Sequence, residues 1–381
     1  MRGWNIISLN DEIEKFLLEQ GALKVGFATK KTLEGGPSTV DITYPLPEAE
    51  SAICFTLPLD RDKIRAFLRK DLTNGRRGHE LDNIKTNIRA FKIAIRTAKL
   101  LREKGYKSVE VFPNFKYRED VPGWEINMIP ELSLKLIAAR SGAGSIGWSG
   151  NLGLKGYGAP IIIGCVVTSA KLMPTNPIPP EESFCDKCKL CQSVCALRMF
   201  GSNESESLSM GGYNFTCSKR VNLARCQVVC GGLSGLDKTG KWSTWSPGRY
   251  PYPENDKEVM RLLSLAVTNA VKWPESGDEF GISESELRKD EELLNALVND
   301  KEKLIDMLKT TKLTCGNCQL ICWGDPELTK ENYKILTNSG CVIQKENGEI
   351  LVLPPDDAEK TFSAMDSKHQ KLYFRELHRS K

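Results

Sequence analysis

The N-terminal third of the chain carries hydrophobic patterns typical of both helices and strands. Residues 11–20 have the pattern of a helix, and Gly21 marks its end. Short apolar runs at 24–28 and 52–57 predict strands. Between 80 and 104, apolar residues recur every three or four positions, which predicts one long amphipathic helix. Its apolar stripe consists of Ile84, Ile88, Phe91, Ile95, Ala98 and Leu101.

The same mixture of patterns continues to about residue 175. We expect a strand at 107–112, a helix at 130–139 with Pro130 in its first turn, and a strand at 159–168. The longest apolar run lies in this last strand and is far shorter than the ~20 residues of a membrane helix. The pattern therefore predicts an α/β core and no membrane span.

The proline-rich segment 173–183 separates this core from a region rich in cysteine. We predict an α/β core at 1–175 and a cysteine-rich module at 176–325, with a long insertion at about 231–312. Residues 326–381 form a tail that we expect to pack on the core or to mediate assembly.

Composition narrows the class of protein. The chain has 381 residues and a net charge of +4, from 53 basic and 49 acidic residues, which is too slight to indicate nucleic-acid binding by itself. The N-terminus shows no export signal, so we expect a cytoplasmic protein. There are 13 cysteines but only three histidines. Clustered cysteines in such a chain indicate a metal site rather than a disulfide framework.

The first cysteine run reads Cys185-x2-Cys188-x2-Cys191-x3-Cys195. In two-cluster ferredoxins, three thiolates at this spacing hold one 4Fe–4S cluster, and the fourth binds the other cluster. Ala196 stands where such runs usually have proline, which is not a ligand. The run therefore predicts the start of a two-cluster module.

The second run, Cys315-x2-Cys318-x3-Cys322, complements the first. Cys322 would complete the first set of ligands, and Cys315 and Cys318 would join Cys195 in the second. The last ligand must come from between the runs, where the candidates are Cys217, Cys226 and Cys230. This crossed ligation predicts two 4Fe–4S clusters.

Zinc is the alternative for these cysteines. One Cys-x2-Cys pair from each run could bind a single ion, but Cys191, Cys195 and Cys322 would then have no role. The spacing therefore favours iron–sulfur clusters. Cys54 and Cys165 fall in predicted strands, and we expect both to be small core residues.

The string Gly142-x-Gly144-x-x-Gly147 matches the dinucleotide-binding fingerprint. Its context differs, because it follows a predicted helix instead of a strand. The remaining interpretations are a tight loop that needs positive φ angles, or a loop whose backbone closely approaches a large flat cofactor. In the second case, Trp148 and Asn151 would add an apolar wall and a polar contact.

Residues 127–195 resemble the superfamily of cobalamin-dependent reductive dehalogenases and epoxyqueuosine reductase. The order of features carries the resemblance: an apolar helix, an AGxG-type loop, a tyrosine–glycine strand entry, a proline-rich join and the first cysteine run. The resemblance resumes at Cys226 and at 315–322, and the context NLARC favours Cys226 as the remaining ligand. It implies a nitroreductase-like core that holds base-off cobalamin, with a ferredoxin-like module carrying two 4Fe–4S clusters.

The resemblance also implies an activity and a cofactor site. Electrons from an external donor, such as ferredoxin or flavodoxin, would pass through the clusters to cobalt for reductive chemistry on an unidentified small-molecule substrate. Replacement of Gly144 or Gly147 by a bulkier residue should weaken corrinoid binding and leave the clusters intact. The residues expected to bind the corrinoid are Gly142, Gly144, Gly147, Trp148, Gly150, Asn151 and Leu152.

Two departures from the superfamily concern proton donation. Asn127 stands where epoxyqueuosine reductase has an aspartate, and asparagine cannot serve as a general acid near neutral pH. Dehalogenases pair a tyrosine with a basic residue, but residues 161–163 are all isoleucine here. Tyr106 and Tyr117 are the candidate acids. We expect turnover of organohalides or epoxyqueuosine to be absent or poor.

The segment 61–107 holds 15 basic and five acidic residues. It is either a solvated helix face or a docking surface for an acidic electron donor or tRNA, and the lack of interleaved aromatic residues disfavours nucleic acid. Two other functions stay open. One is an electron-transfer protein that reduces or carries a corrinoid for a partner protein, and the other is a tRNA-modifying enzyme.

Overall fold

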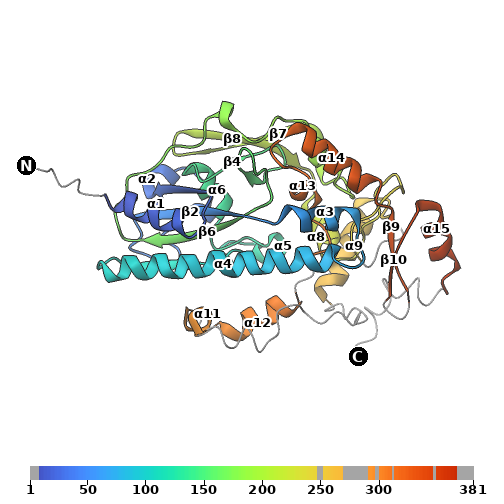
Figure 1. Ribbon diagram of the computed structural model, residues 1–381, viewed down its shortest axis with the longest axis horizontal. Helices are drawn as coiled ribbons and strands as arrows, with labels where there is room; N and C mark the ends of the chain where they lie inside the picture. The colour runs from blue at the N-terminus through green and yellow to red at the C-terminus, as the bar shows by residue number, and fades with distance from the viewer. Residues whose placement is uncertain are drawn as a thin grey trace, which may run out of the picture.

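The computed structural model describes residues 8–246, 252–268, 291–296, 300–310, 313–345 and 349–366. Its centre is a four-stranded antiparallel sheet with the strand order β1-β2-β6-β3 (Figure 1). The mixed α/β class expected from the sequence is confirmed. The strands are β1 (Lys24–Thr29), β2 (Ser51–Pro58), β6 (Ile161–Thr168) and β3 (Ser108–Val111).

Both faces of this sheet are buried. Successive side chains of a strand point to opposite faces, so Ile53 and Phe55 of β2 enter one hydrophobic cluster and Ala52 and Cys54 enter another. Cys54 pairs with Cys165 across β2 and β6, and both are fully buried, as expected for core residues. A sheet covered on both faces explains why these strands read as continuous apolar runs.

Helices cover the two faces of the sheet. The long helix α4 (Gly75–Glu103) packs on one face, and α6 (Leu134–Arg140) packs on the other (Figure 1). The predicted apolar stripe of α4 is buried or partly buried along its whole length. The face with α4 also carries α1 (Leu9–Glu19) and α3 (Arg61–Arg69).

One predicted helix begins later than the pattern indicated. The chain from Pro130 to the helix start is not helical, because Pro130 forms an isolated bridge with Tyr117. Helix α6 starts at Leu134, after Ser133. The expectation that Pro130 occupies its first turn is wrong.

The sequence pattern did not reveal a hairpin in the cysteine-rich region. It consists of β7 (Phe200–Met210) and β8 (Tyr213–Arg220), joined by Gly211 and Gly212 with φ angles of 53° and 81°. A Gly-Gly pair between two strands is a turn signal, because both positions need positive φ. The hairpin lies on the same side of the sheet as α6 (Figure 1).

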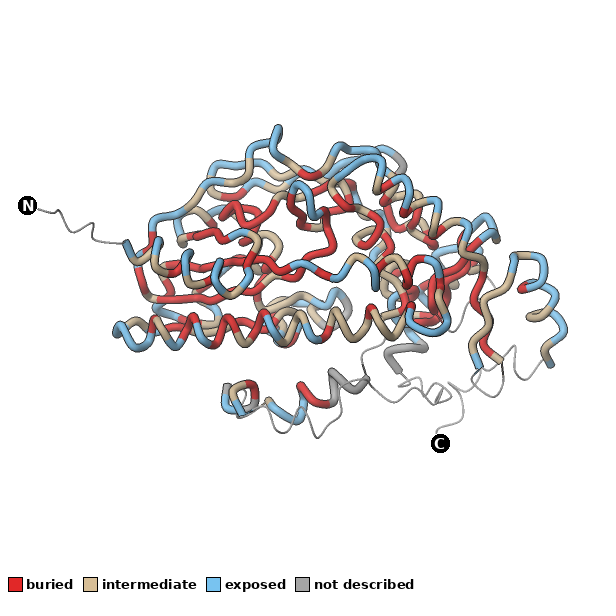
Figure 2. The backbone as a smooth tube through the Cα atoms, in the orientation of Figure 1, coloured by how far each residue is buried: buried red, intermediate tan, exposed pale blue. Residues whose placement is uncertain are grey.

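The cysteine-rich region shares a core with the sheet. Val194, Leu320 and Trp323 belong to the same hydrophobic cluster as the strand residues Ile53 and Phe55. Figure 2 shows buried backbone running from the sheet into this region. Its short helices α7 (Leu190–Ser193) and α13 (Asn317–Leu320) pack on each other.

The remaining elements surround these parts. Helix α14 (Pro326–Thr337) packs against α3, so part of the tail lies on the core. Within the described ranges, no helix has the length and apolar character needed to cross a membrane. The remaining helices and strands are α2 (Lys30–Leu33), α5 (Trp124–Asn127), β4 (Ser145–Ile146), β5 (Leu152–Gly153), α8 (Leu223–Cys230), α9 (Asp256–Thr268), α11 (Glu291–Ala296), α12 (Lys301–Thr310), α14 (Pro326–Thr337), β9 (Cys341–Gln344), β10 (Ile350–Leu353) and α15 (Pro355–Ala364).

Candidate metal centre

Four cysteines from both runs form what we call the first thiol group: Cys185, Cys188, Cys191 and Cys322. Cys191 lies within electrostatic range of the other three. The pKa of Cys322 is raised to about 12, mainly by burial and also by the neighbouring Cys185 and Cys188. Contact between α7 and α13 brings these distant parts of the sequence together.

Five cysteines form the second thiol group: Cys195, Cys226, Cys230, Cys315 and Cys318. Burial raises the pKa of Cys195 to about 12, and Cys318, Cys315 and Cys226 act in the same direction. On α8, the Sγ atoms of Cys226 and Cys230 lie 3.7 Å apart. Cys315 lies beside Cys230, and it raises the pKa of the Cys230 thiol together with Cys226.

The two thiol groups adjoin each other. Cys191, in the first group, has Cys318 of the second group as its strongest charged neighbour. Cys191 and Cys195 follow one another along the first run, and Cys318 and Cys322 along the second, so each run contributes to both groups. The crossed ligation expected from the spacing stays a prediction, and Cys230 is an additional cysteine in the second group.

Hydrogen-bond donors point at thiols of both groups. The backbone N–H of Trp148 donates to Sγ of Cys185 at 3.2 Å, and that of Met199 donates to Sγ of Cys195 at 3.2 Å. The side-chain amide of Asn151 lies 3.6 Å from Sγ of Cys318. Such donors stabilise thiolates and tune iron–sulfur clusters.

The side chains of both groups supply sulfur alone, which is the ligand type of iron–sulfur clusters. Among the described residues, no three His, Cys, Asp or Glu side chains are arranged to hold a single metal ion. Cys217, the other candidate for the remaining ligand, lies on the hairpin, where its thiol faces Glu206 at 3.6 Å.

The glycine-rich loop links α6 to the short hairpin β4–β5, so it lacks the strand-to-helix context of a dinucleotide site. Its glycines pack against the protein itself. A Cβ on Gly144 would lie 2.7 Å from the side chain of Leu152, and one on Gly147 would lie 2.6 Å from Phe184. A Cβ on Gly142 would lie 2.2 Å from a backbone oxygen.

These contacts change one expectation. Gly147 also faces Cys185, whose Cβ would lie 3.3 Å from an added Cβ. Bulk at Gly147 should therefore disturb the first thiol group, whereas the sequence led us to expect intact clusters.

A cluster of charged residues beside Gly150 was not identified from the sequence. Lys135 on α6 donates to the backbone oxygen of Gly150 at 3.3 Å, and burial lowers its pKa to about 8. Arg220 lies next to it and donates to the oxygen of Ser149 at 3.4 Å. The sequence did contain a signal, because Lys135 stands among the apolar residues at the start of this helix.

The three candidate catalytic residues lie in two places. Tyr117 stacks on Trp124, with ring centroids 5.7 Å apart, and burial raises its pKa. Asn127 is exposed at the end of α5, where its amide donates to the oxygen of Gly123 at 3.1 Å. Tyr106 packs instead against the hydrophobic cluster that contains Ile53 and Phe55.

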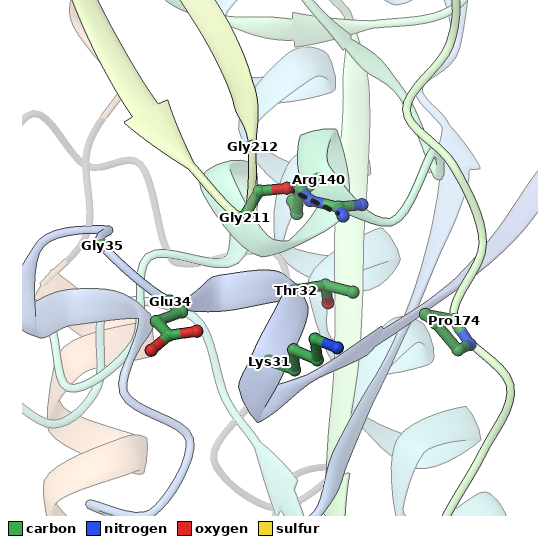
Figure 3. A pocket seen from close by; sticks show the side chains of 8 residues that line it. All are labelled: Lys31, Thr32, Glu34, Gly35, Arg140, Pro174, Gly211 and Gly212. Atoms are coloured by element: carbon green, nitrogen blue, oxygen red, sulfur yellow. Dashed lines mark hydrogen bonds between the residues drawn. The ribbon is translucent and has the colours of Figure 1, made fainter.

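A separate pocket of about 530 Å³ lies where the hairpin turn meets α2 and α6 (Figure 3). The guanidinium of Arg140 is buried there and donates to the oxygen of Gly211 at 3.3 Å. It also covers the ring of Tyr213 at 4.6 Å. The pocket is lined by Lys31, Thr32, Glu34, Gly35, Arg140, Pro174, Gly211 and Gly212.

No protein-family model matches the chain, and no curated protein matches it. Among solved structures, it matches a B12-dependent reductive dehalogenase with a TM-score of 0.43 and 15% identity, over 60% of this chain and 30% of that one. The chain thus spans under a third of that protein's length. It also matches an epoxyqueuosine reductase bound to a tRNA stem loop, and the same enzyme from Bacillus subtilis. These two have TM-scores of 0.38 and 0.39, and each has 15% identity over 96% of both chains.

Proposed function

We propose that the protein is an iron–sulfur reductase that carries two 4Fe–4S clusters and uses a corrinoid to reduce a small-molecule substrate still to be identified. The convergence of two distant cysteine runs into two adjoining thiol groups carries the proposal. Buried thiolates need a compensating positive charge, which the iron of a cluster supplies.

The assignment of ligands follows the two groups. Cys185, Cys188, Cys191 and Cys322 would hold the first cluster. Cys195, Cys226, Cys315 and Cys318 would hold the second. Because the groups adjoin, the protein would hold the clusters near enough for electrons to pass between them.

The corrinoid part of the proposal rests on the sequence resemblance. When bound, a corrinoid supplies the cobalt redox chemistry. The loop at 147–152 would contact it, since Trp148 and Asn151 are only half-buried there. Beside this loop, Nζ of Lys135 holds a proton that can be exchanged near neutral pH, which Asn127 cannot do.

One observation favours the second candidate function, an electron-transfer protein without substrate chemistry of its own. The space beside Gly144 and Gly147 is filled by the protein's own side chains. The need for glycine at these positions is therefore explained without a cofactor. The clusters would then serve a partner protein.

The basic helix face is one candidate surface for an external electron donor. Part of it is neutralised, because Arg96 binds both carboxylate oxygens of Glu292, at 2.7 and 2.8 Å. Lys99 stays largely exposed, next to Glu103. A docking site for an acidic ferredoxin or flavodoxin would therefore have to use only part of this face.

Anaerobic purification followed by iron, sulfide and cobalt analysis tests the proposal. We expect about eight irons with matching acid-labile sulfide per chain. Added cobalamin should change its visible spectrum on binding. Zinc without sulfide would contradict the cluster assignment, whereas eight irons without corrinoid binding would favour the electron-transfer protein.

A further inference from the structure

The second thiol group contains one cysteine more than a cluster needs. A 4Fe–4S cluster takes four protein thiolates, one at each iron. The first thiol group has four cysteines, but the second has five. The additional member is one of the two cysteines on α8, Cys226 and Cys230.

Both α8 thiols face the same site. Residues four apart on a helix lie on one face, and the 3.7 Å between the two Sγ atoms agrees with this geometry. Cys226 lies within electrostatic range of Cys195 and Cys318. Cys230 contacts Cys226 and Cys315. Cys226 therefore lies near Cys195 and Cys318, whereas Cys230 lies near Cys315.

Their exposure differs. Cys230 is exposed, whereas Cys226 is half-buried. The exposure of Cys230 as a residue does not place its thiol outside the group, because that thiol lies beside both Cys226 and Cys315. Because the two thiols are almost in contact, a rotation about one side-chain bond could exchange them without moving the helix.

We infer that Cys230 is a reserve ligand of the second cluster, able to take the place of Cys226 at the same iron. The inference rests on the proposed function, because it requires a cluster in the second thiol group. It assigns to Cys230 a role in metal binding that the spacing of the two runs does not require. The first thiol group has no such reserve.

Three alanine variants test this role: Cys226→Ala, Cys230→Ala and the double variant. Alanine is used because a serine oxygen can itself ligate iron. The matched control is Cys217→Ala, which removes a cysteine outside both thiol groups. Each protein is reconstituted anaerobically and analysed for iron and acid-labile sulfide, and circular dichroism checks its fold.

We expect about eight irons in each single variant and in the control, and about four in the double variant. About four irons in either single variant would overturn the inference, and so would eight irons in the double variant. The two single variants test the inference even where the double variant does not fold, because a loss of iron in either one overturns it. A wild-type protein without iron and sulfide would instead refute the proposed function, and the reserve ligand with it.

Discussion

The two thiol groups draw on the same two cysteine runs but differ in how they are secured. The first has four thiols, and the glycine loop contacts one of them, Cys185, through the backbone N–H of Trp148 and through Gly147. The second has five, two of which come from α8, an element outside both runs. If both groups hold clusters, the comparison predicts that the first depends on every one of its cysteines, whereas the second tolerates the loss of one ligand.

The largest effect that sharpens this comparison is expected from Cys322→Ala. No other thiol of the first group can replace Cys322, so the variant should fall from about eight irons per chain to about four. The measurement is iron and sulfide analysis beside Cys226→Ala, which should retain all of its iron. Equal losses in both variants would show that the two groups do not differ.

A second test concerns the packing around His79, which is linked through Phe67 and Trp245 to the second thiol group. His79 is buried against Phe67, and Trp245 ties Phe67 to Thr314, the neighbour of Cys315. Burial lowers the pKa of His79 to about 4, from an unfolded value of about 6.5. The neutral form is favoured in the fold, so stability should be complete above about pH 6.5 and fall as the pH drops toward 4.

The total decrease in the free energy of unfolding between these pH values would be about 3 kcal/mol. His79→Leu should remove this pH dependence, because leucine has no proton to bind. Urea unfolding of both proteins at several pH values measures the difference. Parallel pH profiles for wild type and variant would contradict the role given to His79.

The smallest expected effect comes from Gly147→Ala. The added Cβ would press on Phe184 and Cys185, and overpacking of this kind costs about 1–3 kcal/mol. We expect lower occupancy of the first cluster and an unchanged second cluster.

Gly78→Ala is the matched control for this substitution. Gly78 lies on α4, and its added Cβ would meet nothing closer than 3.9 Å. Electron paramagnetic resonance of the reduced proteins distinguishes the two clusters. Loss confined to the second cluster in Gly147→Ala would reverse the comparison.

The sequence predicted the sheet core well, because its signals are local. The stripe on α4 follows from the helical period, and β2 and β6 from short apolar runs. The start of α6 was wrong, since the bridge between Tyr117 and Pro130 depends on a residue distant in sequence. The hairpin was missed although Gly211 and Gly212 mark its turn.

For the candidate site, the sequence by itself determined that seven cysteines fall into two runs with short, regular spacing, from which shared ligation was predicted. Only the tertiary structure decided the rest. In the structure, Cys230 lies beside Cys226, and Cys217 lies on the hairpin. The glycine loop packs against Phe184 and Leu152. These are contacts between segments far apart in sequence, or between neighbours on a helix face, and spacing alone cannot show which of them reach the same thiols.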